Sequence, residues 1–257
     1  RSRFMLESIL SLNIFAFMMI FARVGTAFFL FPGFRGKQVN IRTRLVIALA
    51  ISFLLTPLLM DILPAMPGDP LLLLLILAGE ILSGAVLGTA AMIMFSAMQV
   101  AGTIISFVSA MANALIFDPI AQQQSAIVAG FLSTAATLLL FVTDLHHVLI
   151  QALIDSYSLF KPGAAHIMGD ISELIVRQVS AAFKLGTQLA APFIVVSIVY
   201  NLALGLMTRL SPQIPIFFVA MPFQLVLSIV LLMIVMPSIL MAFLYRFQDG
   251  LTPFLTP

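Results

Sequence analysis

The sequence has no cysteine, no tryptophan and few charged residues. Without cysteine the chain forms no disulfide bond and offers no thiolate ligand to a metal. Without tryptophan, any aromatic belt at a membrane surface depends on phenylalanine and three tyrosines. Charged residues make up 9% of the chain and hydrophobic residues 62%, whereas a soluble domain carries about 25% charged residues. The composition predicts an integral membrane protein, and a net charge of +2 gives no indication of nucleic acid binding.

Six apolar stretches are long enough, or nearly so, to cross a membrane as helices, which takes about 20 residues. They are 9–31, 44–60, 71–99, 127–154, 178–208 and 215–245. A helix satisfies its own backbone groups, and these stretches lack the alternation of a barrel strand, so the predicted fold is all-α. The first stretch is too long for a signal-peptide core and shows no convincing cleavage site, so we expect a retained span.

Charge in the connections predicts a topology. The connection 31–44 has four cations and no acid, which favours the cytoplasm, and these are Arg35, Lys37, Arg42 and Arg44. The connection 60–70 is expected on the other side, and 155–177 is expected to be a solvated loop with a short helix. Six plain crossings would put both termini outside. Another apolar run lies at 101–116. If it crosses or re-enters the membrane, the predicted side of every later connection is reversed.

A polar stretch, ALIFDPIAQQQSA, interrupts the apolar chain at 114–126. Pro119 disfavours helix at Asp118, and Asp118 suits the N-cap of a following helix. One interpretation is a plain interhelical loop. The other is a re-entrant or pore-lining plug segment near 107–125, because irregular backbone at membrane depth is tolerated beside protein or a water-filled cavity. In that case the compliant plug residues are Met111, Asn113, Ile116 and Phe117, with Gln122 to Gln124 facing a wet path.

Glu80 is the buried polar candidate, since it lies about 14 Å into its apolar stretch, where an acid is costly. It is either functional or a structural acid, hydrogen-bonded by Ser83 or by a partner subunit. Arg23, Lys184 and Arg209 lie nearer the ends of their stretches, where snorkelling explains them.

Other motifs indicate packing more than chemistry. Gly84 and Gly88 form a GxxxG pair, and Ala97 and Ala101 are spaced likewise, which favours close helix approach. Prolines in apolar segments predict kinked helices, at positions 192, 212, 215, 222 and 237. The adjacent His146 and His147 project about 100° apart on a helix, so no metal site is predicted at Asp144-Leu-His-His. No catalytic motif, cofactor motif or enzyme activity is indicated.

The stretch 191–222 resembles the signature of the FliR family, the R-type subunit of the flagellar export gate, with more distant relatives in type III secretion. The matching residues are Ala191-Pro192, Asn201 to Gly205, Arg209, Pro212-Gln213, Phe217 and Pro222. The stretch 23–57, which begins at Arg23, resembles the N-terminal part of the family. Asp118-Pro119 and His146-His147 also fall where the family has them, so the resemblance covers nearly the whole chain.

The resemblance implies a non-enzymatic, pore-forming component that helps unfolded flagellar subunits cross the bacterial inner membrane at the flagellar basal body. It implies P-type (FliP) and Q-type (FliQ) subunits in a hetero-oligomeric helical ring, with a B-type (FlhB) subunit at the cytoplasmic entrance. The implied fold is a P-like part, 1–177, fused to a Q-like helical hairpin and tail, 178–257. It also implies that the loop from Met111 to Asp118 plugs the channel, although relatives have aromatic residues at the positions of Asn113 and Ile116.

A second hypothesis is a secondary transporter of small solutes that couples ions through Glu80 and Asp144. It calls for an inverted repeat, which the sequence does not show. A transporter would be stable alone or as a small homo-oligomer, whereas a gate subunit would co-purify in a large hetero-oligomer.

Overall fold

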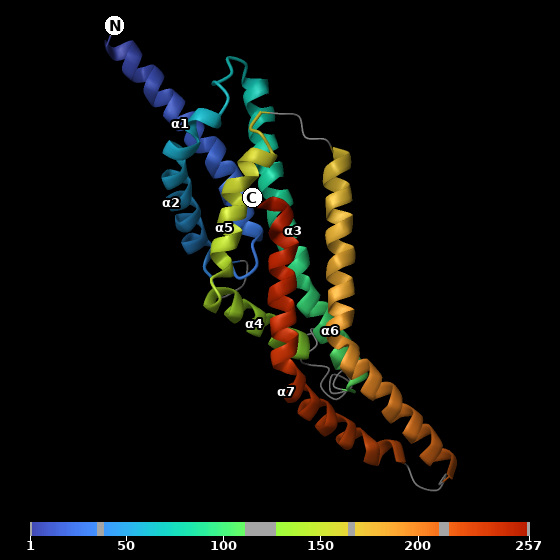
Figure 1. Cartoon of the computed structure of the whole chain (residues 1–257). Coiled ribbons are helices and arrows are strands. Elements are labelled where there is room, and N and C mark those ends of the chain that lie inside the picture. The colour runs from blue at the N-terminus through green and yellow to red at the C-terminus, as the bar shows by residue number, and fades with distance from the viewer. Residues whose placement is uncertain (1, 35–38, 111–126, 164–167, 211–215, 256–257) are drawn as a thin grey trace. The chain divides into compact units, whose positions relative to one another are not determined.

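The computed structural model describes residues 2–34, 39–110, 127–163, 168–210 and 216–255. These residues form α-helices and short 3-10 helices with no strand among them, as the sequence predicts (Figure 1). The helices are α1 (Ser2–Leu30), α2 (Ile41–Leu59), η1 (Met60–Ile62), α3 (Pro70–Val108), α4 (Ile127–Val142), α5 (Leu145–Leu159), α6 (Met168–Leu210), α7 (Ile216–Leu251) and η3 (Thr252–Phe254).

Four helices among the described residues are long and apolar enough to cross a membrane. They cover Ile41–Ile62, Pro70–Val108, Ile171–Leu210 and Ala220–Phe254, and they match four of the six predicted stretches. The first predicted stretch lies in α1, where Ile14–Leu30 is a shorter apolar helix. These helices make the chain a membrane protein, and α4 and α5 together raise the number of spans to five if they count as one.

The predicted span 127–154 is not one straight helix, because α4 and α5 meet at an angle of 74°. Between them Asp144 has φ 58°, in the left-handed region, which ends one helix before the next begins. Aspartate tolerates this conformation better than most residues. The backbone amide of His147 then donates to the carbonyl of Asp144 and starts α5.

The apolar run 101–116 begins inside α3, which continues without a break through Val108. The chain leaves the helix at Ala110, which has φ 58°. Residues 111–116 lie outside the described residues. The predicted loop 155–177 is shorter than expected, since α5 extends to Leu159 and α6 begins at Met168.

Contacts divide the chain into two compact units. Unit 1 comprises 1–93, 141–178 and 248–257, and unit 2 comprises 94–140 and 179–247. The core of unit 1 includes Met19, Ile20, Val24, Phe28, Leu153 and Phe254. The core of unit 2 includes Met98, Leu132, Leu140, Phe193 and Phe243. The predicted division into a P-like part, 1–177, and a Q-like part, 178–257, is a different division, which rests on the family resemblance and stays a prediction.

Small residues bring helices close together in both units, as predicted for the GxxxG pair. A Cβ atom added at Gly84 would lie 2.3 Å from the backbone oxygen of Arg23, and one at Gly88 would lie 2.6 Å from Cβ of Leu30. In unit 2, a Cβ atom added at Gly102 would lie 2.3 Å from Cα of Ala129. The backbones therefore touch where any side chain would separate them.

In unit 2, α6 and α7 form a hairpin whose helices are bent (Figure 1). Pro192 lies inside α6, and Pro222 and Pro237 lie inside α7, where each proline removes a backbone hydrogen bond. The hydroxyl of Tyr200 on α6 donates to the carbonyl of Ala220 on α7 and ties the two helices together. The predicted kinked hairpin is present in the described residues.

Candidate functional site

A buried ion pair lies at the centre of unit 1. Nε of Arg23 on α1 donates to Oε2 of Glu80 on α3 at 2.7 Å. The two side chains are 0% and 1% exposed. The prediction that Arg23 snorkels is therefore wrong, because protein surrounds this part of α1 and the guanidinium finds its partners inside the unit.

Helix α5 supplies the remaining partners of the Arg23 guanidinium. One terminal nitrogen donates to Oγ of Ser156 at 3.3 Å, and the other donates to the carbonyl of Phe160 at 2.8 Å. The guanidinium carbon lies 4.0 Å from the ring centroid of Tyr157. Arg23 thus joins α1, α3 and α5, and the Phe160 carbonyl is available because α5 has just ended at Leu159.

The contacts of Glu80 are those of a buried, ion-paired acid. Glu80 is buried and paired with Arg23, a partner that neither interpretation of this acid named. The Ser83 hydroxyl donates to the carbonyl of Gly79 at 2.9 Å. A paired carboxylate is costly to release because Arg23 would be left as a buried charge. The carboxylate of Asp144 is 76% exposed. The ion-coupling hypothesis therefore gains no support from Glu80 and Asp144.

The family-motif residues of α6 lie in a different environment. Asn201, Gly205 and Arg209 are spaced by four residues, which places them on one face of the helix, and all three are exposed. A Cβ atom added at Gly205 meets no described atom within 4 Å. Pro192 is half-buried. Pro212 and Gln213 lie outside the described residues.

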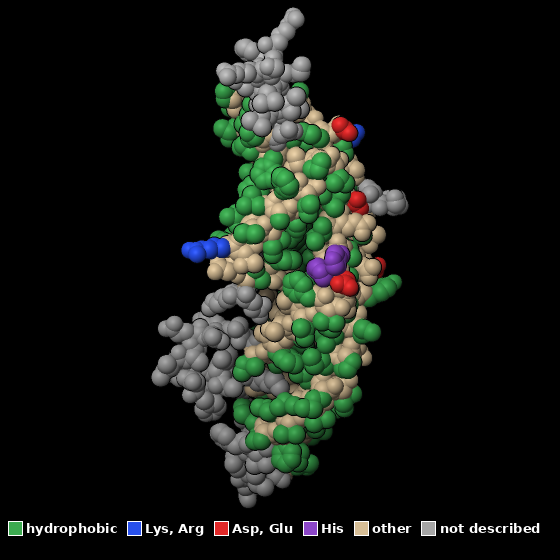
Figure 2. All heavy atoms as spheres, turned by 90° about the vertical axis from the view of Figure 1, so that its left-hand side faces the viewer, with side chains coloured by type: hydrophobic (Ala, Val, Ile, Leu, Met, Phe, Trp, Pro, Cys, Tyr) green, Lys and Arg blue, Asp and Glu red, His purple; other side chains and the backbone are tan. Residues whose placement is uncertain are grey.

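The hairpin also exposes a large apolar surface. Within the membrane-length window of α7, 11% of the residues are buried, against 33% in α3. Its exposed hydrophobic side chains include Phe223, Val226, Val230, Met233, Ile234 and Met241. The face that lies on the left-hand side of Figure 1 also carries many hydrophobic side chains and few charged ones (Figure 2). Such helices need lipid or another protein around them.

Three potential metal ligands come together at the bend between α4 and α5. Ligand atoms of Asp144, His146 and His147 lie within 4.8 Å of one another. Nδ1 of His147 is 3.5 Å from Oδ1 of Asp144, and both side chains are more than two-thirds exposed. The absence of a metal here stays a prediction.

The plug residues Met111, Asn113, Ile116, Phe117 and Asp118 lie outside the described residues, as do Gln122 to Gln124. The first residues of the predicted plug segment belong to α3 in unit 2. The side-chain amide of Gln224 on α7 donates to the carbonyl of Val108 at 3.0 Å. The amide of Ser109 donates to the carbonyl of Ile105 and completes the last turn of α3.

Sequence reasoning missed three of these contributions. It did not pair Arg23 with Glu80, although two opposite charges in separate apolar stretches are a signal that each needs a partner. It did not identify Tyr157 or Gln224, because a lone tyrosine or glutamine in an apolar helix gives no signal of what it contacts.

Apolar, kinked helices, a buried ion pair and a hairpin with exposed hydrophobic side chains define an integral membrane protein that presents apolar faces to its surroundings. Residues 14–250 match the model of the bacterial export proteins, family 1. The chain belongs to this family, that of the FliR proteins.

The chain is similar to curated FliR proteins over most of their length. The chain is 34% identical to the flagellar biosynthetic protein FliR of Caulobacter vibrioides, over 94% of this chain and 96% of the relative. It is 31% identical to the FliR protein of Pectobacterium carotovorum, over 87% and 83% of the two chains. It is 29% identical to FliR of Escherichia coli, over 90% and 86%.

Proposed function

We propose that this chain is a non-enzymatic subunit of the flagellar protein export gate, in the bacterial inner membrane at the flagellar basal body. The observation that carries the proposal is the family match over 14–250, together with relatives named for flagellar biosynthesis. The cargo would be unfolded flagellar subunits, and the chain would contribute to the wall of the passage they cross.

The surface of unit 2 supports an assembling subunit. The motif residues Asn201, Gly205 and Arg209 form an exposed face, and packing within the described chain does not require a glycine at 205. A glycine is useful where another helix approaches closely. P-type (FliP) and Q-type (FliQ) subunits would cover the apolar hairpin, with a B-type (FlhB) subunit at the cytoplasmic entrance.

The plug segment would close the passage at rest. Bulky apolar side chains exclude water and ions from a narrow pore, and Met111, Ile116 and Phe117 supply them. A loop held by few contacts is displaced at modest cost when cargo enters. The Gln224 to Val108 hydrogen bond would fix where this loop leaves α3.

Co-purification tests the proposal. An affinity-tagged chain is expressed with its P-type and Q-type subunits, extracted in mild detergent and weighed by native mass spectrometry. A large hetero-oligomer containing all three subunit types supports the proposal. A monomer or small homo-oligomer under conditions in which the other two subunits assemble would overturn it.

A further inference from the structure

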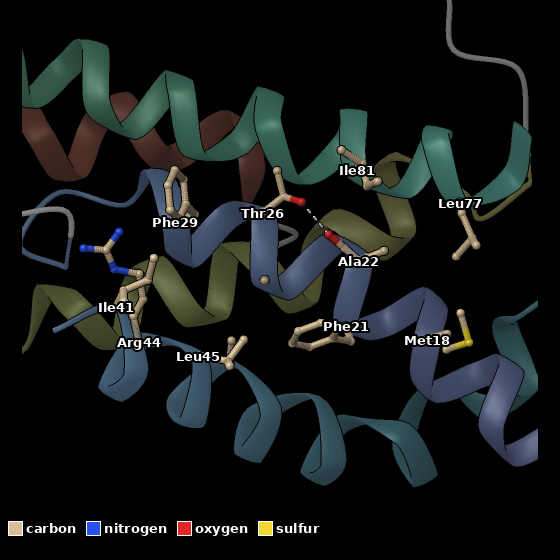
Figure 3. Close-up of a pocket in the computed structure, with 12 residues that line it drawn as sticks. Met18, Phe21, Ala22, Thr26, Phe29, Ile41, Arg44, Leu45, Leu77 and Ile81 are labelled. Carbon is tan, nitrogen blue, oxygen red and sulfur yellow. Dashed lines mark hydrogen bonds between the residues drawn. The ribbon is translucent and has the colours of Figure 1, made fainter. Parts of the chain in front are cut away.

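An apolar groove in unit 1 runs between α1, α2 and α3 and has a volume of about 600 Å³. Hydrophobic side chains line it, among them Met18, Phe21, Phe29, Leu45, Leu77 and Ile81 (Figure 3). Its volume falls in the range of small-molecule sites in proteins. All of its lining residues belong to unit 1.

Arg44 brings charge to this apolar groove. Its side chain rises from α2 toward α1, with the guanidinium carbon 5.2 Å from the ring centroid of Phe29 (Figure 3). Arg44 is 9% exposed, and its buried Nε has no hydrogen-bond partner among the described residues. A buried donor without a partner is costly, so this site favours an anionic acceptor.

The groove has two distinct ends. Arg44 and Ile41 lie at one end together with Phe29, and Met18 and Leu77 lie at the other (Figure 3). Phe29 and Met18 are eleven residues apart on α1, which corresponds to about 16 Å along a helix. Half of a bilayer hydrocarbon core is about 15 Å thick. A cationic end and an apolar channel of that length match a phospholipid headgroup and one acyl chain.

We propose that this groove binds one anionic phospholipid, with its phosphate on the Arg44 guanidinium and one acyl chain lying toward Met18. Sequence charge supports an anionic lipid, since the connection 31–44 carries four cations and no acid. Basic segments next to a membrane attract anionic lipids, and arginine suits phosphate through its paired donors. This site is independent of the export function and would exist in the chain whatever it transports.

The test uses the full chain with the subunits that co-purify, reconstituted in nanodiscs of equal parts phosphatidylethanolamine and phosphatidylglycerol. After extraction, native mass spectrometry measures the lipid that stays bound. Wild type is expected to retain phosphatidylglycerol, and Arg44→Gln is expected to retain at least about tenfold less, as for the loss of one charge-assisted hydrogen bond. The matched control is Arg42→Gln, which removes an exposed cation two residues away and is expected to lose far less lipid than Arg44→Gln.

A second variant keeps the charge and fills the channel. A Cβ atom added at Gly25 meets the Phe21 ring at 3.6 Å, an ordinary contact, and Gly25 lines the groove, so the leucine of Gly25→Leu is expected to extend into the groove. It should lose lipid while Arg44 is intact. The proposal is overturned if Arg42→Gln and Arg44→Gln lose lipid equally, if Gly25→Leu retains it, or if cross-linking from Leu45 finds a neighbouring subunit in the groove. Circular dichroism confirms that each variant is folded.

Discussion

Nε of Arg23 lies 2.7 Å from Oε2 of Glu80, in a pair that links α1 to α3 and is closed to solvent. Two charges in a low-dielectric interior stabilise the fold only as a pair. We expect Arg23→Met and Glu80→Leu each to cost about 3–5 kcal/mol of stability, because each leaves one buried charge alone. The double variant should recover most of that loss. Thermal unfolding followed by circular dichroism measures all three.

The exposed pair of Glu173 and Arg177 is the control for this cycle. Its side chains are 64% and 78% exposed and lie one helical turn apart. Glu173→Ala should cost no more than about 0.5 kcal/mol. If the Arg23 and Glu80 single variants were as mild as this control, the buried pair would not stabilise unit 1.

Gly84 marks the closest approach of α1 and α3. Its missing Cβ would lie 2.3 Å from the Arg23 carbonyl oxygen, so Gly84→Ala must push the two backbones apart. We expect a loss of about 1–3 kcal/mol, as for other overpacked sites. Gly130→Ala, where no described atom lies within 4 Å, should stabilise α4 by about 0.5–1 kcal/mol. Equal effects on the melting temperature would contradict the close approach.

A substitution at Gly205 is expected to change the assembly of the chain with other subunits without changing its folding. Gly205→Leu places a side chain in open space on α6, so the purified chain should be as stable as wild type or slightly more stable. The yield of hetero-oligomer with P-type and Q-type subunits should nevertheless fall severalfold. Gly130→Leu, also in open space but outside the family motif, is the control. Undiminished assembly of Gly205→Leu would show that this face meets no other subunit.

The hydrogen bond from Gln224 to the Val108 carbonyl is expected to fix the point at which the predicted plug segment leaves α3. Gln224→Leu removes the hydrogen bond to the Val108 carbonyl and should loosen the last turn of α3, which raises the resting ion conductance of the assembled gate. Gln188→Leu replaces an exposed glutamine on α6 and should leave the conductance unchanged. Planar-bilayer recordings of both variants measure the difference.

The apolar stretches predicted where helices run, because a membrane helix is defined by length and composition. Gly84 and Gly88 likewise predicted close packing from their spacing. The partner of Glu80 was not predictable in this way, since Arg23 lies 57 positions away and local patterns carry no information on tertiary pairing. The bend at Asp144 was missed because hydropathy averages over a single left-handed residue. Arg23 was misjudged because distance to a span end does not show which face of a helix protein covers.

The central claim is that this chain helps surround a passage that its plug segment closes. It is tested most directly by the ion conductance of the assembled, reconstituted gate in which Met111, Ile116 and Phe117 are all replaced by glycine. We expect a resting leak well above that of the wild-type gate, with the assembly itself intact by native mass. Conductance that stays at the wild-type background in an intact assembly would contradict the claim.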